Sequence, residues 1–208
     1  MRSFLCLLGT LAYFVLMVSC HTKPPTEPIE KVVVIDTISI DTLIECNSHT
    51  LNHISEYDSL IKIEAAKIGW DWRMLASIIY QESRFNPDLI NEKGAFGLMQ
   101  LMPVTMSKYG IDYDSSVEEQ LEAGGKLLLY FDNQLPESIS DSLERGNFIL
   151  ACYNAGLGNI QKARTKAEKK GMNPDIWFDN VENCAPKQTY HFVREITERY
   201  SLYKTLIK

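Results

Sequence analysis

Residues 71–87 read DWRMLASIIYQESRFNP, which is typical of one amphipathic helix with both of its ends marked. Asp71 is a good N-cap, because its carboxylate can accept a hydrogen bond from a backbone N–H of the first turn. At the other end, Pro87 disfavours helical backbone at Asn86. We therefore predict a helix over residues 72–83.

Glu82 lies on the apolar face of that predicted helix. Leu75, Ile78 and Ile79 precede it by seven, four and three residues, and these spacings share one face. A carboxyl among apolar neighbours, at the negative end of a helix dipole, is costly to ionise, so its pKa should be raised. Such a group can donate a proton near neutral pH, as a general acid must. Taken alone, however, a glutamate at a helix end is more often a surface residue.

The rest of the chain after about His53 has the same helical period. We predict further helices over residues 54–68, 98–100, 103–109, 117–133, 143–154, 157–170 and 189–206. The pair Gly124-Gly125 inside one of them weakens that helix and is typical of a close approach by a neighbouring element. The pattern predicts one all-α domain over residues 53–208. Residues 31–44 alternate in part, so a strand is possible there.

Two later motifs accompany the Glu82-Ser83 pair. Residues 94–103 read GAFGLMQLMP, and residues 151–158 read ACYNAGLG. In this order and at this spacing the three motifs resemble the lytic transglycosylase family, which has the fold of goose-type lysozyme. The membrane-bound lytic transglycosylase F type resembles the chain best, through residues 135–138 and 170–177. The resemblance covers residues 54–200 and implies a lysozyme-like (SLT-type) helical fold.

The resemblance also implies the site residues. Glu82 would be the sole catalytic acid and base. Ser83 would steady it or contact the N-acetyl group of the substrate. The remaining residues that the resemblance assigns to substrate binding are Gly97, Met99, Gln100, Tyr153, Asn154 and Phe192. Each has a structural alternative: Ser83 can cap the helix, Met99 can be core, and the Tyr153 hydroxyl can bond backbone.

Phe192 is a departure from the family pattern, because many relatives carry a tyrosine that faces the catalytic carboxylate at this position. The hydroxyl is missing here, which puts that contact in doubt. Tyr190, two residues earlier, cannot lie on the same helical face.

The implied reaction is cleavage of the MurNAc–GlcNAc β-1,4 bond in peptidoglycan without water, which leaves a 1,6-anhydro-MurNAc end. Glycosidases that use water normally need a second carboxylate across the bond. No second acid has a motif here, and Asp88 follows Pro87 in a predicted turn. Two alternatives stay open: a goose-type lysozyme-like hydrolase, and an inactive peptidoglycan-binding envelope lipoprotein.

The N-terminus has the layout of a secretory signal peptide: Arg2, then an apolar run from Phe4 to Val18 that is short for a membrane span. Residues 16–20 read LMVSC and resemble a lipobox, in which Cys20 is lipidated. We predict a signal over residues 1–19 and a lipidated tether over residues 20–52, with a plain cleaved signal as the alternative. His21 favours an exported protein held by lipid on the outer membrane, facing the periplasm.

The charge excludes nucleic acid as the main partner. The chain carries a net charge of -6, and phosphate binding needs a basic face. A basic run over residues 162–170 is either a solvated face or a surface for acidic stem peptides. We predict a monomer without a cofactor. We also predict no metal site, because Cys46, His49 and His53 lack a fourth ligand. Cys152 and Cys184 could pair, but a buried free Cys152 is the favoured interpretation.

Overall fold

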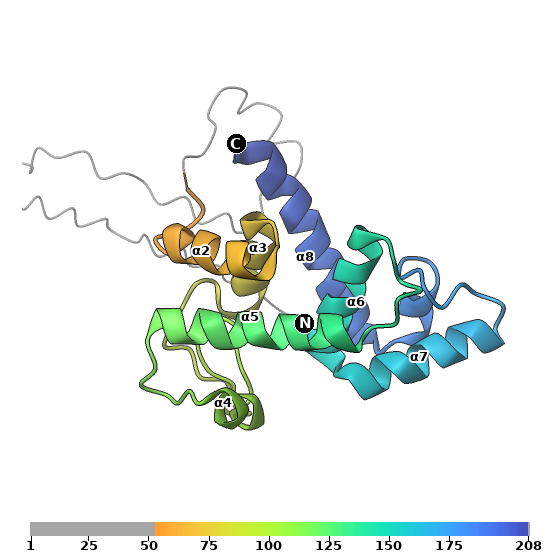
Figure 1. Cartoon of the computed structure of the whole chain (residues 1–208), viewed down its shortest axis with the longest axis horizontal. Coiled ribbons are helices and arrows are strands. Elements are labelled where there is room, and N and C mark those ends of the chain that lie inside the picture. The colour runs from red at the N-terminus through yellow and green to blue at the C-terminus, as the bar shows by residue number, and fades with distance from the viewer. Residues whose placement is uncertain (1–52, 208) are drawn as a thin grey trace, which may run out of the picture. The chain divides into compact units, whose positions relative to one another are not determined.

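The structure, a computed structural model, describes residues 53–207 (Figure 1). The elements in chain order are α2 (Asp58–Ile68), α3 (Trp72–Ser83), α4 (Pro103–Tyr109), α5 (Val117–Gln134), α6 (Ser142–Ala155), α7 (Leu157–Lys169), the 3-10 helix η1 (Val181–Cys184) and α8 (Lys187–Leu206). Over this range no strand forms, and only isolated bridges join residues 90, 96 and 101. The all-α prediction is confirmed. The predicted signal, Cys20, tether and possible strand lie outside the described residues.

Capping residues set several helix ends where the sequence predicts them. Asp71 accepts a hydrogen bond from the Arg73 backbone N–H at 3.0 Å, so α3 begins at Trp72. Ser116 and Glu119 form a reciprocal capping box at the start of α5. Pro103 occupies the first turn of α4, where its missing N–H costs nothing. The predicted bounds of α3 and α4 are confirmed.

The predicted short helix over residues 98–100 is wrong. This segment is a tight turn, closed by reciprocal backbone hydrogen bonds between Phe96 and Leu101 at 2.9 and 3.0 Å. Gly97 and Gln100 have left-handed backbone, with φ of 77° and 46°, which a right-handed helix excludes. The 3-10 helix η1 was not predicted from the sequence. Helix α8 begins at Lys187, two residues before its predicted start.

α5 packs against α2 at Gly125 and against the 97–101 turn at Gly124. A Cβ on Gly125 would lie 2.2 Å from Glu64 Oε1 of α2, and one on Gly124 would lie 2.1 Å from Met99 Sδ. The predicted close approach at the glycine pair is therefore confirmed. It brings the 97–101 turn and α2 against the same helix (Figure 1).

α8 packs against both α3 and α6 (Figure 1). Trp177 is fully buried, and its ring packs edge-on against Phe148 of α6, with 5.6 Å between the ring centroids. Cys152 is buried and Cys184 partly buried, and both are free thiols, as the favoured interpretation predicts. Among the described helices, none combines the length and the apolar character of a membrane span.

Candidate active site

Glu82 sits at the C-terminal end of α3, beside a fully buried stripe of Leu75, Ile78 and Ile79. Its side chain is partly exposed, so a ligand can reach it. Burial raises the pKa of Glu82 from its ordinary 4.5 to about 8, and no charged neighbour contributes to the increase. Within residues 53–207 no group donates a hydrogen bond to this carboxyl. The carboxyl is thus protonated at neutral pH and free to donate.

Ser83, the next residue, is buried and points away from solvent. Its hydroxyl lies 2.8 Å from the Leu98 carbonyl oxygen and 3.2 Å from that of Ile79, so it donates its hydrogen bond to the backbone. The contact with Leu98 ties the end of α3 to the 97–101 turn. Ser83 therefore fixes the backbone next to Glu82.

Gln120 on α5 holds the 97–101 turn, and no sequence motif signalled it. Its side-chain oxygen accepts a hydrogen bond from the Leu98 N–H at 2.9 Å, and its nitrogen donates to the carbonyls of Pro87 and Ser115 at 3.2 and 3.0 Å. The side chain is 3% exposed, so these bonds are shielded from water. A Cβ on Gly97 would lie 2.2 Å from that same oxygen. Position 97 therefore requires glycine for two reasons: its φ is positive, and the Gln120 side chain occupies the place of a Cβ atom.

Met99 and Gln100 lie in the same turn but in different surroundings. Met99 is fully buried, with its sulfur against Gly124, so its side chain belongs to the core and presents no floor to a cleft. Gln100 is partly buried, and its side-chain nitrogen donates to the carbonyls of Leu89 and Gly97 at 2.9 and 3.0 Å. These bonds leave its side-chain oxygen available.

Tyr153, near the end of α6, is bonded to the 97–101 turn and lies near Glu82. Its hydroxyl donates a hydrogen bond to the Met99 carbonyl oxygen. Burial raises the pKa of Tyr153 well above its usual value, and the nearby Glu82 carboxylate raises it further. Both effects keep the hydroxyl neutral, and the second means that Tyr153 and Glu82 are electrostatic neighbours. The Tyr153 hydroxyl therefore bonds backbone, which is the structural alternative given above. The same residue also lies near Glu82.

Asn154 and Phe192 are the remaining residues that the resemblance assigns to substrate binding. Asn154 Oδ1 accepts a hydrogen bond from the buried Thr189 hydroxyl of α8 at 2.8 Å, which orients the amide. Phe192 is buried in α8, which packs on α3. Asp88 lies in an exposed turn, where its N–H donates to Asn86 Oδ1 at 3.0 Å. In the part of the chain that the structure describes, no group of three or more potential ligands could hold a metal ion.

Known proteins are similar to this chain in sequence. The sequence model of the family described as Transglycosylase SLT domain matches residues 59–176. A membrane-bound lytic murein transglycosylase F from Marinobacter nauticus is 38% identical over 134 residues, which are 64% of this chain and 26% of that protein. One from Pseudomonas fluorescens strain Pf0-1 is 38% identical over 139 residues, which are 67% of this chain and 28% of that protein. The chain thus spans about a quarter of the length of these curated relatives.

Solved structures share the fold. The 70 kDa soluble lytic transglycosylase from Escherichia coli superposes with a TM-score of 0.55 at 25% identity, covering 72% of this chain and 24% of that one. An inactive mutant of lytic transglycosylase Slt from Pseudomonas aeruginosa gives a TM-score of 0.52 at 23% identity, with 72% and 24% of the two chains covered. The predicted lysozyme-like SLT-type fold is therefore confirmed.

Proposed function

Because the chain belongs to the transglycosylase SLT domain family, we propose that it is a lytic transglycosylase that cleaves the MurNAc–GlcNAc β-1,4 bond of peptidoglycan without water. The relatives are named lytic murein transglycosylases, and the proposal carries that activity over to this chain. The observation that carries the proposal is Glu82, a single partly exposed carboxyl whose pKa of about 8 arises from burial alone.

The first step is proton donation by Glu82. Its carboxyl is protonated at neutral pH, so it can protonate the glycosidic oxygen as the C1–O bond breaks. A hydrolase would need a second carboxylate within about 5–9.5 Å, either as nucleophile or as base. No second acid has a motif in the sequence, and the resemblance implies a single catalytic carboxylate, Glu82. We therefore assign the nucleophile to the substrate: the oxygen of the MurNAc 2-acetamido group attacks C1.

The second step returns the proton. Glu82, now a carboxylate, accepts the proton of the MurNAc 6-hydroxyl as that oxygen displaces the acetamido oxygen from C1. The product is a 1,6-anhydro ring, Glu82 is protonated again, and no water is consumed. The same burial that keeps the acid protonated makes its conjugate base strong, which suits a residue that serves in both steps.

The neighbouring residues position Glu82 and the sugar. Tyr153 supports the turn through the Met99 carbonyl, and its neutral hydroxyl adds no charge beside Glu82. The Asn154 amide, oriented by Thr189, and the free side-chain oxygen of Gln100 are the polar contacts that we assign to the sugar. Phe192 contributes apolar surface only, since it lacks a hydroxyl.

We also infer an exported envelope protein. Relatives are named membrane-bound, which supports association with a membrane. Lipidation of Cys20, the outer membrane as its location and a monomeric state belong to the same proposal. Metabolic labelling with a fatty acid, in the full chain and in Cys20→Ala, tests the anchor: label that persists in the variant contradicts it.

Digestion of purified sacculi tests the reaction. The domain without residues 1–20 is incubated with sacculi, and mass spectrometry identifies the ends of the released muropeptides. We expect 1,6-anhydro ends from the wild type and none from Glu82→Gln, which keeps the shape of the side chain but cannot exchange the proton. Reducing ends would mean hydrolysis, and binding to sacculi without products would mean an inactive binding module.

A further inference from the structure

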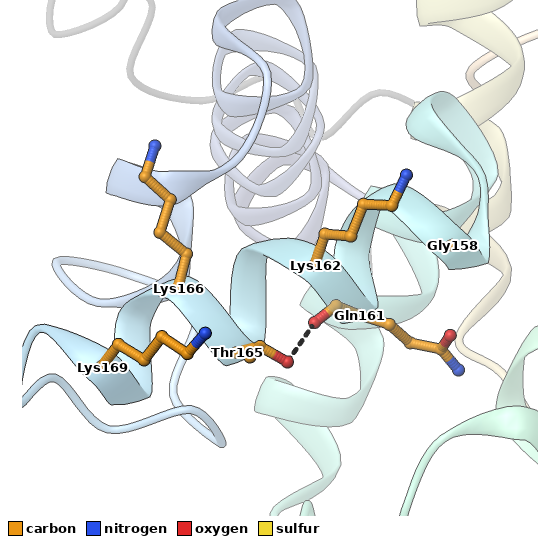
Figure 2. Close-up of a pocket in the computed structure, with 6 residues that line it drawn as sticks. All are labelled: Gly158, Gln161, Lys162, Thr165, Lys166 and Lys169. Carbon is orange, nitrogen blue, oxygen red and sulfur yellow. Dashed lines mark hydrogen bonds between the residues drawn. The ribbon is translucent and has the colours of Figure 1, made fainter.

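The exposed face of α7 carries a row of lysines. An open hollow of about 510 Å³ runs along this face, lined by Gly158, Gln161, Lys162, Thr165, Lys166 and Lys169. Their spacings of three and four residues put them on one side of the helix, and the buried residues Ile160, Ala163 and Ala167 lie on the other. Figure 2 shows Lys162 and Lys166 projecting to the same side, with Lys169 extending along the helix toward Thr165.

These three lysines, the α7 lysine row (Lys162, Lys166 and Lys169), have no protein partner among residues 53–207. By contrast, Arg164 on the same helix pairs with Asp175 and donates to the Pro174 carbonyl. Like charges four residues apart repel on a helix, so the row raises the energy of the free protein slightly. An anionic ligand would relieve that repulsion. The row is therefore a local positive surface on a chain whose net charge is -6.

The position of the row relates it to the candidate active site. α7 begins at Leu157, three residues after Asn154. At a rise of 1.5 Å per residue, the three lysines lie roughly 8, 14 and 18 Å from the start of the helix. A ligand that occupies both places must be extended and must carry repeated negative charges. A single small anion would bind a compact cluster better than a row of this length.

We propose that the α7 lysine row binds carboxylates of the stem peptides on the glycan strand that the enzyme cuts. The inference rests on the proposed function, since it takes peptidoglycan as the substrate. Stem peptides are acidic and recur along the strand, which matches the charge and the extent of the row. The hollow is open to solvent along the helix, so a peptide segment can lie in it. The lysines thus add affinity for strands that carry peptides, with no part in the chemistry.

The test compares two triple variants of equal charge. In the first, Lys162, Lys166 and Lys169 become Gln. In the control, the exposed residues Lys62, Lys126 and Lys204, on three other helices, become Gln. KM and kcat are measured on glycan strands with intact stem peptides and on strands stripped of them by an amidase. An exposed charge pair changes affinity about two- to threefold, so three together should raise KM about tenfold.

We expect that increase only for the α7 variant, only on strands with stem peptides, and with kcat unchanged. The difference should shrink in high salt, because the lysines are exposed. Equal KM for the two variants overturns the inference, as does an increase on stripped strands. Loss of binding to phosphatidylglycerol vesicles with unchanged KM would assign the row to a membrane and also overturn it.

A failure of the proposed function is distinguishable. Sedimentation with sacculi, measured in a Glu82→Gln background, reports binding without cleavage. If the wild type released no product, weaker sedimentation of the α7 variant than of the control, on intact sacculi alone, would still support the row. Equal sedimentation would overturn it.

Discussion

The burial of Glu82 predicts that replacing it with Gln stabilises the protein, and increasingly so as the pH rises. In the folded state the carboxyl keeps its proton up to about pH 8, whereas in the unfolded state it ionises near its ordinary 4.5. Between these values the folded state binds more protons, so wild-type stability falls as pH rises and levels off above about pH 8. Gln has no proton to lose, so Glu82→Gln lacks this decline.

The size of the effect follows from the pKa difference. Each unit corresponds to about 1.4 kcal/mol, so raising the pH from 5 to 8 changes the contribution of Glu82 by at most about 3.5 kcal/mol. The side chain is partly exposed, and water relieves part of this cost. We therefore expect the free energy of unfolding of Glu82→Gln to gain about 2 kcal/mol relative to wild type over that range.

Urea denaturation at pH 5, 6, 7 and 8 measures this difference directly. Glu198→Gln, at an exposed position on α8, is the matched control and should follow the wild type at every pH. A Glu82→Gln difference that stays constant between pH 5 and 8 would refute the reasoning, since it would mean that Glu82 titrates at an ordinary pKa.

Three other predictions concern activity and the turn. Muropeptide release should fall tenfold per pH unit above about pH 8, as Glu82 loses its proton; a rate that persists at pH 9.5 contradicts its role as acid. Gly97→Ala should destabilise by about 3 kcal/mol in thermal unfolding, because its Cβ meets Gln120, whereas Gly110→Ala, with a φ of 74° and nothing within 4 Å, should cost only about 1 kcal/mol. Tyr153→Phe removes the hydrogen bond to Met99, so we expect about 1 kcal/mol less stability and about tenfold lower kcat; wild-type kcat would show that the hydroxyl is dispensable.

The sequence predicted those parts of the fold that local chemistry controls. Asp71 and Pro103 start helices through their effect on adjacent backbone, and the helices that follow them have the predicted bounds. The apolar stripe beside Glu82 likewise predicted the direction in which its pKa is shifted. Helical periodicity is a property of consecutive residues, so one sequence is enough to detect it.

The parts that depend on distant side chains were missed or wrong. The 97–101 turn has helix-forming residues, but Gln120, about 20 positions later, holds it in another conformation. A side chain that bonds three separate backbone segments leaves no periodic pattern in the sequence. Similarly, η1 is held by the Glu182–Arg194 ion pair with α8, which spacing along the chain does not reveal. Met99 was expected at the floor of the cleft, with core packing as the alternative; its side chain is fully buried and packs where Gly124 has no side chain.

The most direct test of the central claim is the fate of water oxygen in the reaction. Sacculi are digested in water labelled with oxygen-18, and the new sugar ends are analysed by mass spectrometry. If Glu82 alone serves as acid and base with the MurNAc 6-hydroxyl as acceptor, the products are 1,6-anhydro muropeptides that carry no label. Labelled reducing ends would mean that water is the acceptor, and would contradict the one-carboxylate mechanism.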